Sequence, residues 1–188
     1  MATFFDKLAP IWDNSPHEYD KREEIVSMMR LPPHSVIVDA GCGKGIMFEH
    51  LLKTNPDKII AVDISGEMLR LAKKLFKSSR IEFIHDDFLS ATLPILDAVV
   101  IFNSYPHFLD KKTLAEKLAS SLKKNGILII AHSRSKVEVN SIHNRNSVSN
   151  LSVHLEAAAA EAKKFYNFFT PDVLIDSDAI YFIRMLKI

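Results

Sequence analysis

Three short segments of the chain combine glycine or acidic residues in a way that could hold a nucleoside. The first is the turn 38–45, Val-Asp-Ala-Gly-Cys-Gly-Lys-Gly, which follows a β-branched run. Glycines in such a turn let the backbone approach a ligand, because a Cβ there would collide with it. If a helix begins after the turn, its unpaired N–H groups and its dipole attract the same ligand. The turn therefore predicts a binding loop.

The other two segments place acids after later apolar runs. Asp63 ends the second run, and Asp86 and Asp87 follow the third. An acid at the end of a second strand typically accepts hydrogen bonds from ribose hydroxyls. A carboxylate after the third strand could accept one from an adenine amino group. Because ligands bind at the carboxyl ends of parallel strands, all three segments are expected at one edge of a sheet.

The spacing of the turn argues against a dinucleotide. A dinucleotide fingerprint reads Gly-x-Gly-x-x-Gly and needs a glycine at position 46, where this chain has Ile46. Asp39 lies two residues before Gly41, and a carboxylate there would repel a pyrophosphate. The Asp39 carboxylate would instead suit a cationic amino group, which it could contact directly or through a water molecule. A nicotinamide-dependent oxidoreductase is kept as a second, less favoured hypothesis.

Two histidines could act on an acceptor on the same side. His107 follows the fourth apolar run and His132 follows the fifth. An imidazole titrates near neutral pH and could take a proton from an acceptor. A structural or loop histidine is the alternative for each. No metal site is predicted, because nothing like His-Glu-x-x-His is present and Cys42 is the single cysteine.

Hydrophobic patterning predicts alternating strands and helices that would position these side chains. Strands are predicted at 35–38, 58–62, 81–84, 96–102 and 127–131, and helices at 17–30, 44–53, 65–77, 110–122 and 152–166. Strands separated by helices imply parallel crossovers. The apolar runs 173–175 and 180–186 are too close for a crossover, so they should pair antiparallel. The predicted fold is α/β: a doubly wound, seven-stranded, mostly parallel, Rossmann-like sheet with an antiparallel terminal hairpin.

One domain is expected over 1–188, with two segments covering the site. Residues 1–33 are predicted to hold an N-terminal cap helix, from which Trp12 and Tyr19 could wall an acceptor pocket. Residues 134–153 include a polar, aperiodic stretch and are predicted to form a lid loop.

Taken together, these segments resemble the class I S-adenosylmethionine-dependent methyltransferases. The turn 38–45 is similar to the family's glycine signature, 61–65 with Met68 to its second-strand segment, and 83–88 to its adenine-edge segment. The opening stretch 4–13 resembles the small-molecule branch that includes ubiquinone/menaquinone biosynthesis methyltransferases.

The resemblance implies S-adenosylmethionine as cofactor and a methyl transfer to a small-molecule acceptor by in-line displacement. In that pattern Asp63 would hold the ribose, and Ile64 and Met68 would flank the adenine. Asp87 aligns best with the adenine-edge acid, and Asp86 is the near alternative. The implied cofactor-binding residues are Asp39, Gly41, Cys42, Gly43, Gly45, Asp63, Ile64, Met68, Asp86, Asp87, Phe88 and Asn103. The segment 103–107, Asn-Ser-Tyr-Pro-His, departs from the Asn/Asp-Pro-Pro-aromatic quartet of amino-group methyltransferases, so it does not specify an exocyclic amine as acceptor.

The composition limits the kinds of partner that the chain is expected to bind. Lys plus Arg number 24 and Asp plus Glu 23, a formal charge of +1. A protein held to nucleic acid mainly by bulk charge would be far more basic. No apolar run is long enough to span a bilayer, and no signal peptide is recognisable at the start, so the cytoplasm is the expected compartment. The alternatives are a nucleic-acid or protein methyltransferase and a non-catalytic module that binds the same cofactor.

Overall fold

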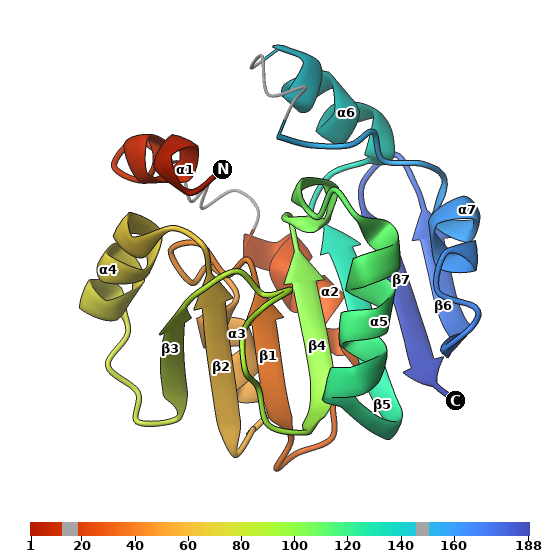
Figure 1. Ribbon diagram of the computed structural model, residues 1–188, viewed down its shortest axis with the longest axis horizontal. Helices are drawn as coiled ribbons and strands as arrows, with labels where there is room; N and C mark the ends of the chain where they lie inside the picture. Colours follow the sequence, from red (N-terminus) through yellow and green to blue (C-terminus); the bar gives the residue numbers. More distant parts are fainter. Residues whose placement is uncertain (13–18, 146–150) are drawn as a thin grey trace.

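The computed structural model describes residues 1–12, 19–145 and 151–188, which contain a single seven-stranded sheet (Figure 1). The strand order is β3-β2-β1-β4-β5-β7-β6. Strands β1 to β5 are parallel, and β7 runs antiparallel between β5 and β6. The predicted doubly wound sheet with its terminal hairpin is confirmed. The strands are β1 Val36–Ala40, β2 Lys58–Asp63, β3 Ile81–His85, β4 Leu96–Phe102, β5 Leu122–His132, β6 Phe169–Asp176 and β7 Tyr181–Lys187.

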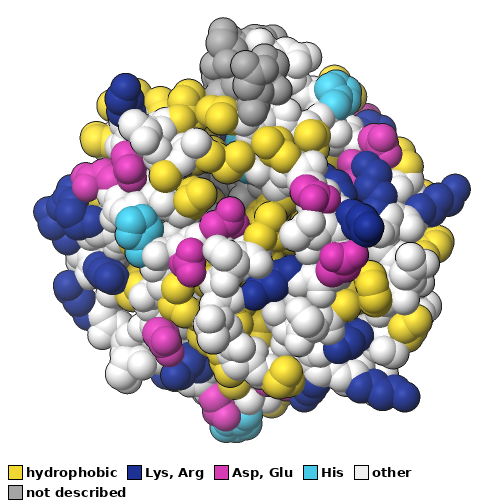
Figure 2. All heavy atoms as spheres, in the orientation of Figure 1, with side chains coloured by type: hydrophobic (Ala, Val, Ile, Leu, Met, Phe, Trp, Pro, Cys, Tyr) yellow, Lys and Arg dark blue, Asp and Glu magenta, His cyan; other side chains and the backbone are white. Residues whose placement is uncertain are grey.

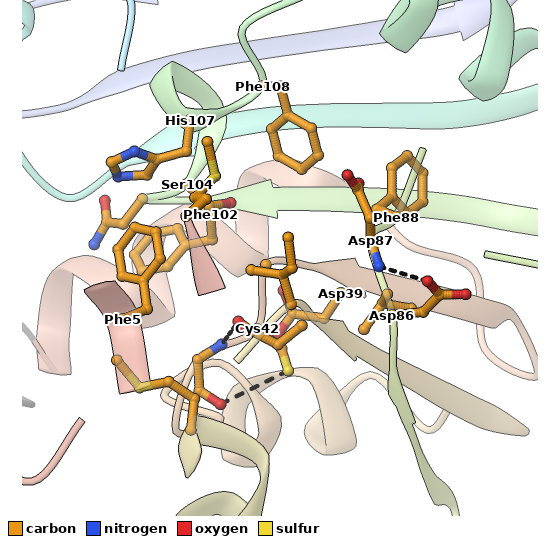
Figure 3. Close-up of a pocket in the computed structure, with 18 of the residues that line it drawn as sticks. Phe5, Asp39, Cys42, Asp86, Asp87, Phe88, Phe102, Ser104, His107 and Phe108 are labelled. Carbon is orange, nitrogen blue, oxygen red and sulfur yellow. Dashed lines mark hydrogen bonds between the residues drawn. The ribbon is translucent and has the colours of Figure 1, made fainter. Parts of the chain in front are cut away.

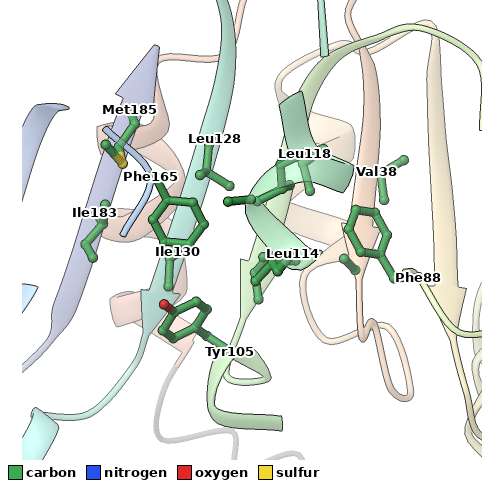
Figure 4. Packing of buried hydrophobic residues seen from close by; sticks show 14 of the residues in the cluster. Val38, Phe88, Tyr105, Leu114, Leu118, Leu128, Ile130, Phe165, Ile183 and Met185 are labelled. Carbon is green, nitrogen blue, oxygen red and sulfur yellow. The ribbon is translucent and has the colours of Figure 1, made fainter. Parts of the chain in front are cut away.

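Helices cover both faces of the sheet. Helices α5 and α7 contribute to one buried apolar cluster, part of which is drawn in Figure 4, and α2, α3 and α4 contribute to the other. Neighbouring residues of one strand belong to opposite clusters, as Val38 and Ile37 of β1 do, which explains why the central strands read as continuous apolar runs. The helices are α1 Ala2–Leu8, α2 Tyr19–Met29, α3 Phe48–Lys53, α4 Gly66–Leu75, the 3-10 turn η2 Tyr105–His107, α5 Lys111–Ser121, α6 Lys136–Arg145 and α7 Ala158–Lys163.

The fifth strand begins earlier than the sequence predicts. Helix α5 starts after its predicted N-cap Asp110, but β5 starts directly at Leu122, with no break at Asn125-Gly126. Leu122 pairs with Leu96 and the next pair is Ile127 with Ala98, so the strand bulges between them. Asn125 takes a φ of 61° in that bulge. An Asn-Gly pair is typical of a turn, and here it forms a bulge inside a strand.

The prediction of a loop over 134–153 is wrong for half of that range, which is helical. Residues 136–145 form α6, which begins with a capping box: Ser135 Oγ accepts from the Glu138 amide at 3.2 Å, and Glu138 Oε2 accepts from the Ser135 amide at 3.1 Å. The buried Asn140 fixes α6 to the following chain, since its side chain makes hydrogen bonds of 2.9 and 2.8 Å with the Leu155 backbone. Residues 146–150 of the predicted lid lie outside the described residues.

Two helix predictions were too long, and the cap segment holds one helix more than predicted. The cap segment 1–33 contains two helices, α1 and α2, with 13–18 outside the described residues. The helix predicted over 152–166 is confined to α7. The helix predicted from 44 begins only at Phe48, because Gly45 has a φ of 82°. None of the helices in the described ranges combines the length and apolar character needed to cross a membrane.

Candidate functional site

A pocket of about 330 Å³ opens at the carboxyl ends of β1, β2 and β4. This is the point where the strand order reverses, because β2 lies on one side of β1 and β4 on the other. In Figure 3, Phe5 and His107 lie on one side of the pocket and Asp86, Asp87 and Phe88 on the other. Most residues predicted to bind the cofactor line it: Asp39, Gly41, Cys42, Gly43, Asp63, Ile64, Met68, Asp86, Asp87, Phe88 and Asn103.

The turn after β1 provides part of the pocket wall with its backbone. Gly43 has a φ of 54°, and a Cβ added there would meet no atom within 4 Å, so this space is open to a ligand. Gly45 differs, because its Cβ would lie 2.4 Å from the Phe48 ring and the residue does not line the pocket. Of these two predicted contacts, the structure places Gly43 at the pocket and Gly45 against the Phe48 ring.

Asp63 connects the two loops that surround the pocket. Its Oδ2 accepts from the Gly43 amide at 2.7 Å and its Oδ1 accepts from the Ser65 amide at 2.8 Å. Burial raises the pKa of this carboxyl, and the two backbone hydrogen bonds oppose that rise. Each oxygen keeps a further lone pair, so the carboxylate can still accept hydrogen bonds from a ligand in the pocket.

Asp39 is the buried acid with an unused hydrogen-bonding atom. Its exposed fraction is 1%, and its Oδ2 has no hydrogen-bond partner within the described part of the chain. Burial, with a smaller contribution from Asp63, raises its pKa to about 7. A buried unpaired carboxylate oxygen is costly unless a ligand supplies the missing donor. The amino group of an S-adenosylmethionine molecule is such a donor, so the residues present fit the predicted cofactor.

The acids predicted at the adenine edge both line the pocket. Oδ1 of Asp86 accepts from the Asp87 amide at 2.8 Å, and Oδ1 of Asp87 accepts from the Leu89 amide at 2.9 Å. These bonds form a turn after β3 that leaves the second oxygen of each acid for other contacts. The geometry does not separate the two candidates.

His107 lies on the opposite side, in η2. Its Nδ1 lies 2.8 Å from the Leu151 carbonyl oxygen, which can only accept a hydrogen bond. The proton of the neutral ring is therefore on Nδ1, and Nε2 carries an unprotonated lone pair. Burial lowers the pKa of His107, which keeps the ring neutral near pH 7. Its ring makes edge-to-face contacts with Phe5 at 5.0 Å and His143 at 5.1 Å between centroids. His107 is thus the predicted acceptor-side histidine that the structure does place at the pocket.

His132 does not line the pocket. It is 2% exposed at the end of β5, where it pairs across the sheet with Tyr181, and burial lowers its pKa to about 3. The structure therefore does not place His132 among the residues that line the pocket, although His107 and His143 are close enough to contribute to its lowered pKa. In the described ranges, no group of three or more His, Cys, Asp or Glu is arranged to hold a metal ion.

Helix α1 lies at the pocket, inside the segment predicted to cap the site, but its residue Phe5 was not predicted to line the pocket. Phe5 lines the pocket together with the predicted Trp12. Asp6 holds the helix in place, because its Oδ1 accepts from Ser65 Oγ at 2.6 Å and from the Glu67 amide at 3.1 Å, at the start of α4. The sequence signal for this arrangement is the opening stretch 4–13, which begins with Phe4-Phe5 followed by an acid. The predicted Tyr19 starts α2, and its side chain lies outside the description.

Comparison with known proteins also indicates a methyltransferase domain. Residues 37–126 match the family model described as "Methyltransferase domain". An uncharacterised methyltransferase of Mycobacterium tuberculosis is 32% identical over 96 residues, which cover 50% of this chain and 48% of that protein. The malonyl-[acyl-carrier protein] O-methyltransferase of Acetivibrio thermocellus is 37% identical over 94 residues, covering 49% of this chain and 33% of that protein. The chain therefore spans half or less of the length of these relatives.

The segment 37–126 is therefore similar to a methyltransferase domain. The whole described fold of the chain resembles the N-methyltransferase NodS of Bradyrhizobium japonicum in complex with S-adenosylhomocysteine, at 17% identity, a TM-score of 0.71, and coverage of 93% of this chain and 89% of that one. S-adenosylmethionine is the cofactor of this domain. The relatives also include a ribosomal RNA small subunit methyltransferase A of Mesomycoplasma hyopneumoniae, 24% identical over 85% of this chain and 62% of that protein.

Gly43→Ala and Gly45→Ala should separate binding from packing in the methyltransferase domain. Both substitutions place an alanine at positive φ, which costs roughly 1–2 kcal/mol. Gly45→Ala should lose additional stability because of the Phe48 clash, whereas Gly43→Ala should fold and lose S-adenosylhomocysteine binding. Urea unfolding and calorimetric titration measure the two effects. Equal loss of stability in both variants, with binding kept in Gly43→Ala, would contradict these assignments.

Asp39 should make cofactor binding depend on pH. Because its pKa in the free protein is about 7 and a bound ammonium favours the ionised form, S-adenosylhomocysteine affinity should fall as pH drops below 7. The loss should approach about tenfold per pH unit. Calorimetric titration between pH about 5.5 and about 8 measures it.

Asp39→Asn is the control for this titration. It should bind weakly at every pH and remove the pH dependence. Since a raised pKa means that ionisation destabilises the fold as pH rises, the variant should also raise the melting temperature of the ligand-free protein above pH about 7. A wild-type affinity that does not change with pH would show that Asp39 does not contact the amino group.

Proposed function

We propose that this protein transfers a methyl group from S-adenosylmethionine to a small-molecule acceptor bound between the turn after β1 and helix α1. The observation that carries the proposal is the buried, unpartnered Oδ2 of Asp39 at the reversal point of the sheet. It provides a counter-charge for an amino acid's ammonium group and is unsuited to a pyrophosphate. The hypothesis of a nicotinamide-dependent oxidoreductase loses support for that reason.

In this proposal each residue has a separate task. Asp39 binds the cofactor's amino group. Asp63 accepts hydrogen bonds from the ribose hydroxyls, and Asp86 or Asp87 accepts one from the adenine amino group. S-adenosylmethionine supplies a methyl group on a cationic sulfur, so the carbon–sulfur bond breaks as the bond to the acceptor atom forms. The pocket accelerates this step mainly by alignment and by excluding water.

His107 would accept the proton of an acceptor that must lose one. Its Nδ1 is committed to the Leu151 carbonyl, so Nε2 is the basic atom. Its lowered pKa keeps that atom unprotonated near neutral pH. A positioned base of this kind contributes about 10²–10⁴-fold to rate.

The charge of the pocket favours a small acceptor over a nucleic acid. Five acids line it, whereas Lys44 is the one lysine or arginine among the described lining residues, and its ammonium donates to the Trp12 carbonyl. A polynucleotide would bring phosphates next to these carboxylates, which is repulsive. The acids are Asp39, Asp63, Asp86, Asp87 and Asp110.

Calorimetric titration with S-adenosylhomocysteine tests the proposal. The wild-type protein should bind it, and Asp63→Ala should weaken binding by roughly 100-fold, because two hydrogen bonds to a charged group are lost. Asp178→Ala, which removes an exposed acid from the turn between β6 and β7, is the matched control and should bind like wild type. Melting curves confirm that each variant is folded, and Asp63→Asn replaces the alanine variant if that one unfolds.

Failure of the wild type to bind S-adenosylhomocysteine would overturn the proposal, and binding of NAD instead would favour an oxidoreductase. Binding without methyl transfer to any acceptor would support the alternative of a non-catalytic module. Tight binding of RNA that weakens steeply with salt would favour a nucleic-acid substrate.

A further inference from the structure

Lys44 is a charged residue of the pocket to which the proposed methyl transfer gives no task. It lies beside Gly43 in the turn after β1, and it is the one lysine or arginine among the described residues that line the pocket. In Figure 2, acidic side chains lie beside hydrophobic ones around the hollow at the centre of this face. An anionic group of a ligand that enters this acidic pocket therefore needs Lys44 as its counter-charge.

The cofactor would bring such an anionic group. The amino acid end of S-adenosylmethionine carries an ammonium and a carboxylate on the same carbon atom, so both must lie close to the acid that binds the ammonium. Asp39 is proposed to bind that ammonium, and Asp63 is close enough to contribute to the raised pKa of Asp39. Both acids would repel the carboxylate unless a cation lies beside it.

The backbone donors of the turn after β1 are already used within the protein. The amides of Gly41 and Cys42 donate to the Val62 carbonyl at 2.8 and 3.1 Å. The Gly43 amide donates to Asp63 at 2.7 Å. A glycine-rich turn often binds an anion with such amides, but here a carboxylate needs a donor from a side chain.

Two side-chain donors across the pocket are likewise committed. The Ser104 hydroxyl donates to the Ala40 carbonyl at 2.9 Å, and Nδ1 of His107 donates to the Leu151 carbonyl at 2.8 Å. The Lys44 ammonium has three N–H donors and uses one of them, so two remain for a ligand.

The donor that Lys44 does use connects it to the N-terminal segment. It bonds to the carbonyl of Trp12, a residue that also lines the pocket and follows α1. Because the ammonium can keep this contact while it binds a carboxylate, one side chain can join the ligand to the chain after α1.

We propose that Lys44 binds the carboxylate of the cofactor's amino acid end and, through the Trp12 carbonyl, fixes the chain after α1 against the bound cofactor. This inference rests on the proposed function and adds a residue that selects for the carboxylate. A nucleoside that carries the ammonium without the carboxylate should bind more weakly and should hold Trp12 less firmly.

Calorimetric titration with two ligands tests the carboxylate contact. One ligand is S-adenosylhomocysteine, and the other is its decarboxylated analogue, which ends in an aminopropyl group and keeps the ammonium. Lys44→Met should bind S-adenosylhomocysteine at least about tenfold more weakly, because a hydrogen bond between two charged groups is lost. The decarboxylated analogue should bind Lys44→Met as well as it binds the wild type.

Further variants separate the contact from other effects of the substitution. Lys44→Arg keeps a cation with several donors and should restore most of the affinity for S-adenosylhomocysteine. Lys74→Met removes an exposed lysine in the last turn of α4, outside the pocket, and should bind both ligands like the wild type. Melting curves show that each variant is folded, and Lys44→Gln replaces the methionine variant if that one unfolds.

Emission from Trp12 tests the link to the N-terminal segment, because it is the single tryptophan of the chain. Trp12 is 40% exposed, so S-adenosylhomocysteine should shift its emission to shorter wavelength as the segment is fixed. The decarboxylated analogue should cause a smaller shift. In Lys44→Met the two ligands should give the same spectrum.

Three results would overturn the inference: equal affinity of the wild type for both ligands, an equal loss of affinity for both in Lys44→Met, or an equal response of wild-type Trp12 emission to both. In each of them S-adenosylhomocysteine still binds the wild type, so the proposed function stands. Failure of the wild type to bind S-adenosylhomocysteine would instead overturn the proposed function, so the two failures are distinguishable.

Discussion

The site depends on the carboxylate of Asp63. By accepting from the Gly43 amide with one oxygen and from the Ser65 amide with the other, it joins the turn after β1 to the start of α4. Ser65 caps α4 and also donates to Asp6 of α1. One buried acid therefore fixes the loop that approaches the cofactor and, through Ser65, the helix that covers it. The parallel pairing of β1 and β2 brings these segments together, because it places both strand ends at the same edge.

Asp39 differs from Asp63 in its hydrogen bonding. Asp63 is stabilised by backbone donors, whereas Asp39 has an oxygen without a partner and a pKa raised by burial to about 7. The free protein holds this acid at a cost in stability. In the proposed function a ligand with an ammonium group removes that cost, so the same unsatisfied atom would select a nucleoside that carries an amino acid. The proposed recognition therefore combines an acid held by backbone donors, Asp63, with an acid that lacks a partner, Asp39.

Local signals predicted the central fold, and long-range packing determined the rest. The β-branched runs, the helical apolar periodicity and the short gap before the last strand were sufficient for the doubly wound sheet, and the acids at strand ends were sufficient for the cofactor side. The contribution of Phe5 and Leu109 to the pocket wall was not predicted, because these residues reach the strand ends only in the folded chain. His132 was expected beside the acceptor and does not line the pocket, because its buried ring lies outside it. Helix α6 was not predicted, although Ser135 and Glu138 form a capping box at its start.

A crystal structure of the complex with S-adenosylhomocysteine tests the central claim most directly. The account predicts that the ligand's amino nitrogen lies within about 3.2 Å of Asp39 Oδ2, with both ribose hydroxyls on Asp63. It also predicts that the Gly43 and Ser65 amides remain bound to Asp63. A ligand whose amino group lies away from Asp39, or whose ribose contacts another residue, would contradict it.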